Sequence, residues 1–403
     1  MHPILKPTLR RGWRDLNTIQ FGVAPAHALV LGPVDTATGS FLQLLDGTRG
    51  LPLLREEGRR MGLPDDHVDK LVRRLSGAGL LDDATGGGSA ADALRKRDQA
   101  MDRLRPDLAS LSVVTAGPGD GMRKLAARRA MRVQVRGAGR VGAVVASVLS
   151  GAGVGQVDVL DGGVVEPRDV APGGHPAEAI GDRRDAAARR GVRQWAPDRP
   201  PRRVRRTAGA ARAAGAARAA EELGEAGTAG TAREEEPALS LVVITPRDGL
   251  DAHAPDPLAA EPLVSSGTPH LYAGVIEGTG VVGPLVLPGA TACAGCLALD
   301  RADRDPTWPR MLAQWRSGRA RHVTACDLAL STTVAGLAAA HALAFLDGAA
   351  PASAGVRWEA SVPGLDWHAR PVSPHLSCPC GAGVVDKGEH PAGDKEPHDT
   401  MAG

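Results

Sequence analysis

Two groups of residues in this chain of 403 residues could do chemistry: a glycine run at residues 137–142 and two cysteine pairs further along. The run places Gly137, Gly139 and Gly142 at the spacing of a nucleotide-binding turn. The first glycine permits the tight turn, the second lets the backbone approach a phosphate, and the third lets the next helix pack closely on the strand. The helix N-terminus then faces the anion. The run therefore predicts a phosphate-binding loop.

The residues around the run favour this interpretation. A short apolar alternation at 133–135 precedes it, and apolar residues at helical spacing follow over 144–149. This is the strand, turn and helix that the fingerprint needs. Asp161 ends the apolar run 157–160, where an acid can bind a ribose hydroxyl. The alternative is a surface turn in a chain with 51 glycines, but the strand, helix and acid favour a Rossmann-like domain.

The cysteines Cys293, Cys296, Cys378 and Cys380 predict a metal site. The first pair has the spacing that lets two thiolates of one turn share a tetrahedral ion, and zinc favours sulfur in closed four-ligand sites. The second pair, C-x-C, is tighter than the commoner C-x-x-C but could complete the site. Reduced, unpaired cysteines and a disulfide are the alternatives, and His375 is an alternative ligand.

Composition limits the classes of function. The formal net charge of +2 gives no broad basic face for nucleic acid. No run of about 18 apolar residues suggests a membrane span, and residues 1–14 lack the apolar core of a signal peptide. Five cysteines in a large chain of this kind favour metal or thiol chemistry over a disulfide framework. We therefore expect a cytoplasmic protein that binds neither DNA nor membrane.

Residues 1–85 predict a small winged-helix-like domain with two short strands followed by three helices. The candidate strands are 18–21 and 28–31, and the candidate helices are 37–45, 51–61 and 65–75. Such a domain reads DNA through a basic third helix, but this helix carries Asp65, Asp66 and Asp69 beside its basic residues. The acidic residues of the third helix therefore disfavour DNA binding by this domain.

Two segments, 44–49 and 75–81, resemble the PqqD-like recognition elements of peptide-modification systems. The resemblance implies a leader peptide that adds as a strand to a sheet edge. Packing on the neighbouring domain alone is the alternative role for residues 1–85.

The rest of the chain divides where composition changes. Residues 86–130 predict a connector with a Gly/Ser-rich start and a charged helical stretch. Residues 131–382 predict the nucleotide-binding domain, with an insertion at 198–236 whose composition cannot bury enough apolar area to become ordered. The polar residues 383–403 predict a disordered tail. Further elements of the nucleotide-binding domain are a strand at 239–245, a hairpin at 270–276 and 281–287, and an apolar helix at 328–346.

The glycine turn, Asp161, the segment Val164-Val165-Glu166 and the split cysteine pairs resemble the ThiF/MoeB branch of the ubiquitin-activating superfamily. With a PqqD-like domain in front, the chain is similar to the ThiF-like proteins of azoline-forming ribosomal peptide systems. The resemblance implies an α/β, Rossmann-like fold with a mostly parallel sheet and a structural zinc. It also implies ATP and magnesium, adenylation of the C-terminal glycine of a small carrier protein, and a homodimer.

The sequence departs from the active members at the nucleotide site. They carry an Asn and an Arg soon after the Val-Glu step, where this chain has Asp169 and Pro172. The usual phosphate-binding lysine corresponds to Arg184 or its neighbour, and the magnesium-binding aspartate corresponds to Asp248. Asp169 puts negative charge where the triphosphate lies, and Pro172 removes a cation that phosphoryl chemistry needs. We therefore expect a degenerate ATP site.

Two functions of different class follow. The first is a peptide-binding partner protein, whose N-terminal domain captures a leader or precursor peptide for a separate modification enzyme. The second is an active adenylyltransferase acting on a carrier or peptide C-terminus, with Asp248 for magnesium and Arg184 for phosphate. The missing Asn and Arg favour the first. No catalytic residue is assigned: Cys326 precedes the apolar helix, whose N-terminus could activate a thiol, but ordinary packing is the simpler interpretation.

Overall fold

A seven-stranded sheet forms the body of the protein in the computed structural model, which describes residues 1–198, 238–317 and 324–382. The strand order is β12-β11-β10-β9-β8-β6-β7. The strands are β6 (Arg132–Arg136), β7 (Gln156–Leu160), β8 (Leu241–Ile244), β9 (His270–Ile276), β10 (Thr279–Val286), β11 (Val356–Ser361) and β12 (His368–Pro371). Most of the predicted insertion and the predicted tail lie outside the described residues.

The expected α/β, Rossmann-like fold is confirmed. Strands β7, β6, β8 and β9 run parallel, and the hairpin β9–β10 continues into the antiparallel strands β11 and β12. The glycine run joins β6 to α7 (Arg140–Gly151). Because the carboxyl ends of parallel strands share one sheet edge, the ends of β6, β7 and β8 meet beside that run.

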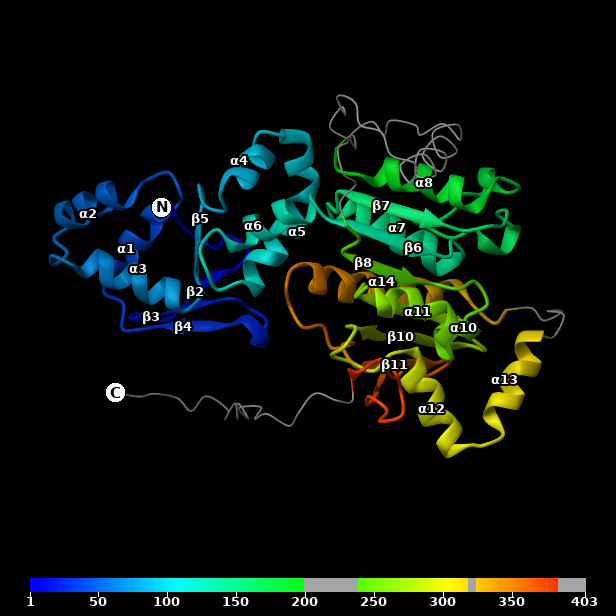
Figure 1. Ribbon diagram of the computed structural model, residues 1–403. Coiled ribbons are helices and arrows are strands. Elements are labelled where there is room, and N and C mark those ends of the chain that lie inside the picture. Colours follow the sequence, from blue (N-terminus) through cyan, green and yellow to red (C-terminus); the bar gives the residue numbers. More distant parts are fainter. Residues whose placement is uncertain (199–237, 318–323, 383–403) are drawn as a thin grey trace, which may run out of the picture.

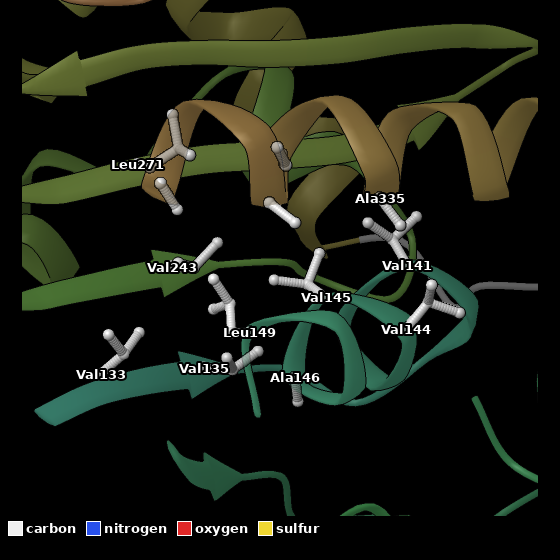
Figure 2. Close-up of a cluster of buried hydrophobic side chains, with 14 of the residues drawn as sticks. Val133, Val135, Val141, Val144, Val145, Ala146, Leu149, Val243, Leu271 and Ala335 are labelled. Carbon is white, nitrogen blue, oxygen red and sulfur yellow. The ribbon is translucent and has the colours of Figure 1, made fainter. Parts of the chain in front are cut away.

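One hydrophobic core lies between this sheet and two helices, α7 and α14 (Leu328–Leu346). Figure 2 shows Val133 and Val135 of β6 and Val145 and Leu149 of α7 gathered in it, with Ala335 of α14 nearby. Each fully buried Val or Leu contributes roughly 1.5–3 kcal/mol. This packing fixes the turn between β6 and α7.

The helix α14 is long and apolar enough to cross a membrane by length and composition. Its residues Leu330, Val334, Ala338 and Ala342 are buried in the core described above. The fold therefore uses α14 as a core helix. The remaining helices around the sheet are α8 (Arg184–Trp195), α10 (Leu250–His253), α11 (Pro257–Ser265), α12 (Ala294–Arg304) and α13 (Trp308–Ser317) (Figure 1).

Residues 1–83 form a separate group of elements with a core that includes Phe41, Leu54 and Leu75 (Figure 1). The elements are β1 (Pro3–Leu5), β2 (Arg11–Asp15), β3 (Thr18–Phe21), β4 (Leu29–Leu31), α1 (Thr36–Phe41), α2 (Leu51–Arg60), α3 (His67–Gly77) and β5 (Leu81–Asp83). They include the two predicted strands and three predicted helices. Strands β2, β3 and β4 form one antiparallel sheet, and β1 pairs with β5.

The segment 86–130, predicted as a connector, holds three packed helices: α4 (Ser89–Arg95), α5 (Asp98–Val114) and α6 (Asp120–Arg128). Leu94, Leu104 and Leu125 are buried together between them. The segment contacts both neighbours. Lys6 donates a buried hydrogen bond to the Thr115 carbonyl at 2.6 Å, and Arg128 forms an ion pair with Asp347 at 2.6 Å.

Candidate functional site

The glycine run forms a tight turn against the end of β8. Gly137 has a φ of +97°, and a Cβ on it would overlap the carbonyl oxygen of Thr245. A Cβ on Gly142 would overlap both the Gly137 carbonyl oxygen and the Thr245 hydroxyl. That hydroxyl donates to the Gly137 carbonyl at 2.9 Å. Only glycine fits these two positions, as expected for a turn that brings backbone close to a ligand.

Asp161 lies at this turn, but its carboxylate is already engaged. It accepts from the Ala138 N–H at 2.8 Å and from the Gly163 N–H at 2.8 Å. Arg184 donates to it at 2.9 Å, and both side chains are about nine-tenths buried. Burial opposes ionisation of Asp161, but the hydrogen bonds from Arg184, Gly163 and Ala138 prevail and lower its pKa.

A second arginine, Arg247, crosses the same region from the end of β8. It forms a two-point ion pair with Asp169, with Nε 2.8 Å from Oδ1 and Nη2 3.2 Å from Oδ2. Its Nη1 lies 2.8 Å from Glu166, and the hydrogen bond from Arg247 lowers the pKa of Glu166 to about 2. A Cβ on Gly139 would lie 3.2 Å from Arg247 Cγ. The Arg247 side chain therefore packs directly against the second glycine of the turn.

The carboxylates and guanidinium groups at the turn satisfy one another. Asp169, which is 2% exposed, also lies 3.5 Å from Arg184. The two arginines thus join three carboxylates, Asp161, Asp169 and Glu166, in one continuous network. A triphosphate would have to displace these carboxylates before either arginine could bind it.

Asp248 stands apart from this network. It is exposed, and within the described chain its carboxylate accepts one hydrogen bond, from the Leu250 N–H at 3.0 Å. Its neighbour Arg247, rather than Asp248, contacts the other candidate residues. The turn therefore unites the three glycines, Asp161 and Arg184, and leaves Asp248 open to solvent.

The four predicted metal ligands come together at a second site. Their sulfur atoms all lie within 4.8 Å of one another: Cys293 is 3.9 Å from Cys296 and 3.6 Å from Cys378, and Cys296 is 3.5 Å from Cys380. A tetrahedron with metal–sulfur bonds of about 2.3 Å has sulfur atoms ~3.8 Å apart. Disulfide bonds are about 2.05 Å long, so these are four free thiols arranged for one ion.

The local structure explains how the two pairs meet. Cys293 caps α12 and Cys296 lies in its first turn. A Cβ on Gly295 between them would lie 2.9 Å from Cys378 sulfur, so glycine makes room for the second pair. Tyr272 packs beside the cluster. Burial raises the pKa of Cys293 and of Cys378 in the metal-free protein, which a bound cation would reverse.

Two other sequence candidates lie outside these sites. Cys326 precedes Asp327, the residue that caps α14 by accepting from Leu330 N–H. Burial raises the pKa of Cys326 despite the nearby Arg140, which is the opposite of an activated thiol. His375 is bonded to Asp303 at 2.9 Å and is outside the cysteine cluster.

Arg247 is the functional candidate that sequence reasoning missed. It lies at the end of β8, the strand next to β6, and its position beside the predicted Asp248 was the available signal. A charged residue at the end of a buried strand faces the sheet edge where ligands bind.

Comparison with known proteins identifies the family of this chain and solved structures that share its fold. The ThiF family matches residues 113–380, whereas no curated protein matches in sequence. Escherichia coli MccB in a structure with ATP is 13% identical, with a TM-score of 0.63 over 94% of this chain and 99% of that chain. MccB, the microcin C7 biosynthetic enzyme, in complex with N-formylated MccA gives the same identity and TM-score over 94% and 100%.

The structure of PaaA is 14% identical, with a TM-score of 0.58 over 91% of this chain and 98% of that chain. At these identities the solved structures establish a shared fold. The family match covers the turn, the ion-pair network and the cysteine cluster. The chain belongs to the ThiF family.

Proposed function

We propose that this chain is a leader- or precursor-peptide-binding partner protein of ribosomal peptide modification, with a degenerate ATP site. The observation that carries the proposal is the closed network of Arg184, Arg247 and three carboxylates at the glycine turn. Phosphoryl transfer needs preorganised cations that are free to meet developing charge. Here the cations are already paired, and Asp169 adds a buried negative charge.

A calorimetric titration of ATP with magnesium into the zinc-loaded protein tests whether the ATP site is degenerate. We expect no detectable heat from the wild type. A matched variant, Asp169→Asn with Pro172→Arg, restores the family residues and should gain affinity. Micromolar binding by the wild type, worth about 8 kcal/mol, would contradict the proposal. The proposal would also be contradicted if the wild type, with an added peptide, exchanged pyrophosphate as fast as the variant does.

For the peptide we propose the exposed edge of the sheet β2–β3–β4 in residues 1–85. In the described chain β4 pairs with β3 alone, and its Leu29 and Val30 are 38% and 52% exposed. An open edge with apolar side chains is the surface to which an extended peptide adds as a strand. MccB, which shares the fold, has been crystallised with the peptide MccA, and this supports a peptide partner.

A charge on that edge tests the location. Val30→Asp should weaken binding of a fluorescent precursor peptide at least about tenfold, an effect of about 1.4 kcal/mol. Leu16→Asp is the matched control, because Leu16 is 93% exposed in the turn between β2 and β3. If both variants bind the peptide with equal affinity, the peptide site lies in the ThiF domain and not on β4.

The second candidate function is an active ATP-dependent adenylyltransferase acting on a carrier or peptide C-terminus. The exposed Asp248 favours it, because a magnesium ligand must be accessible. With the glycine turn intact, ATP binding would require Arg247 to leave Glu166. The calorimetric titration above separates the two functions.

The proposal includes further expectations. The cysteine cluster holds zinc, residues 1–85 and 131–382 act as separate domains, and a modification enzyme receives the captured peptide. The protein works in the cytoplasm, as a homodimer as the family resemblance implies, without binding DNA or membrane. Light scattering of the purified chain with and without peptide checks the oligomeric state.

A further inference from the structure

The sheet β2–β3–β4 has one face toward the helices of residues 1–83, and this decides which side chains of an added strand would meet the protein. Ile19 lies opposite Leu31 and Phe21 lies opposite Leu29. Ile19, Phe21 and Leu31 are buried in the core of that domain. Leu29 is on the same face, because side chains two positions apart in a strand share a face. Val30 therefore faces solvent.

One arginine of α3 lies at the end of β4. Figure 1 shows α3 beside this sheet, and Arg74 of α3 donates from Nη2 to the carbonyl oxygen of Gly32, the residue after β4, at 2.8 Å. That bond uses only one of the N–H donors of the guanidinium group, and Arg74 is exposed. Across residues 1–198, 238–317 and 324–382 no carboxylate pairs with it. Arg74 can therefore accept an acidic partner.

The acidic residues of the same domain that lie nearest in the sequence are already engaged or lie elsewhere. On α3, Asp66 and Asp69 each form an ion pair with a basic side chain other than Arg74. Asp35, which follows β4, caps α1 by accepting from a backbone N–H of that helix. Asp15 lies in β2, at the opposite edge of the sheet. These carboxylates leave the charge of Arg74 uncompensated at the open edge.

Interaction with the helix dipole is an alternative role for a basic residue near the C-terminus of α3. Arg73 fills that role equally well, but it lies toward Asp69. The hydrogen bond from Arg55 lowers the pKa of Asp69, and the charge of Arg73 adds to this effect. The bond to Gly32 thus distinguishes Arg74 from its neighbour and connects it to β4.

We propose that the segment of peptide captured on β4 carries an apolar residue and an acidic residue two positions apart, with the acidic side chain paired to Arg74. Residues directly opposite one another in neighbouring strands point to the same face. A peptide side chain opposite Leu31 therefore points to the helix side, at the end of β4 where Arg74 lies, and an acid there gains a charge-assisted hydrogen bond. An apolar side chain opposite Leu29, which is 38% exposed, covers apolar surface.

This inference rests on the proposed capture of a peptide by β4, and it makes Arg74 a specificity-determining residue of that site. Two heptapeptides with an N-terminal fluorescein test it: Thr-Glu-Thr-Leu-Thr-Glu-Thr, and the same peptide with both glutamates replaced by glutamine. The order of residues is the same in both directions, so a glutamate reaches Arg74 whether the strand adds parallel or antiparallel. Fluorescence anisotropy with the full-length chain measures both affinities.

The wild type should bind the glutamate peptide about fivefold more tightly than the glutamine peptide, the upper range for an exposed ion pair. Arg74→Gln should bind the two peptides equally, with the affinity that the wild type has for the glutamine peptide. Arg73→Gln removes the same charge from the same turn of α3 and should keep the preference. Thermal melting shows that both variants are folded.

Equal affinities of the wild type for the two peptides, a preference that Arg74→Gln keeps, or a preference that Arg73→Gln also loses would overturn this inference. The peptide site itself would still stand in each case if Val30→Asp weakens binding of both peptides. If neither peptide binds, or if Val30→Asp changes neither affinity, the site on β4 is wrong and the role of Arg74 falls with it.

Discussion

Arg247 and Asp169, 78 residues apart in the chain, meet in a two-point ion pair over the second glycine of the turn. Asp169 follows β7 and Arg247 follows β8, the two strands on either side of β6. The pair therefore spans the sheet edge at which a Rossmann-like fold binds its ligand. The family resemblance leads us to expect Asn at position 169, and the Asp169 found there binds Arg247.

Removing Arg247 should destabilise the protein because the buried Asp169 carboxylate loses its two-point partner and keeps only the Glu166 N–H and the longer contact to Arg184. We expect Arg247→Ala to lower the free energy of unfolding by about 1–3 kcal/mol, as measured by urea unfolding. The control is Arg168→Ala, since Arg168 pairs with Glu166 on the surface and is half exposed; it should cost under about 0.5 kcal/mol. Equal costs would show that the pair with Asp169 contributes nothing.

Glu166 should make stability depend on pH in the acid range. Arg247 lowers its pKa from 4.5 to about 2 in the folded protein. A carboxyl group with a lowered pKa in the folded protein stabilises the fold at pH values above its pKa in the unfolded chain. This contribution disappears as the pH falls through its pKa in the folded protein. The wild type should therefore exceed Glu166→Gln in stability at neutral pH, and the difference should shrink from about pH 4.5 to about pH 2. A difference independent of pH would contradict this.

The glycines of the turn should differ in their tolerance of a methyl group. At Gly142 a Cβ meets backbone oxygen of Gly137, which cannot move without breaking the turn. We expect Gly142→Ala to cost about 2–3 kcal/mol. At Gly139 the nearest atom, 3.2 Å away, belongs to the flexible Arg247 side chain, so Gly139→Ala should cost about 1 kcal/mol, mainly as a poorer helix cap. The reverse order in thermal melts would contradict this account.

Local patterns predicted much of the fold, since β3 alternates between apolar and polar residues, and β8, β9 and the helix α14 are nearly continuous apolar runs. The short strand β2 was missed because its residues, Arg-Gly-Trp-Arg-Asp, are all exposed and show no alternation. The segment 86–130 was predicted as a connector because its buried leucines are spread among charged residues. Their packing depends on tertiary contacts such as that between Leu104 and Leu125.

The candidate sites show the same division. Gly137 and the cysteine pairs could be identified from the sequence, because the residues of each motif lie only a few positions apart. Arg247 could not be identified in this way, because its role depends on Asp169, which follows a different strand. An ion pair between residues far apart in the chain leaves no local pattern in the sequence.

The cysteine cluster gives the last prediction. About one zinc ion per chain should copurify, measured by elemental analysis, because four thiols at these distances fit a closed tetrahedral site. The cluster joins the segment 378–380 to α12 beside the sheet, so Cys293→Ser should release the metal and lower the free energy of unfolding by about 3 kcal/mol, the linkage expected for a well-bound ion. Cys326→Ser, outside the cluster, should keep both metal and stability. Metal-free wild-type protein with unchanged melting would show that the four cysteines are merely packed.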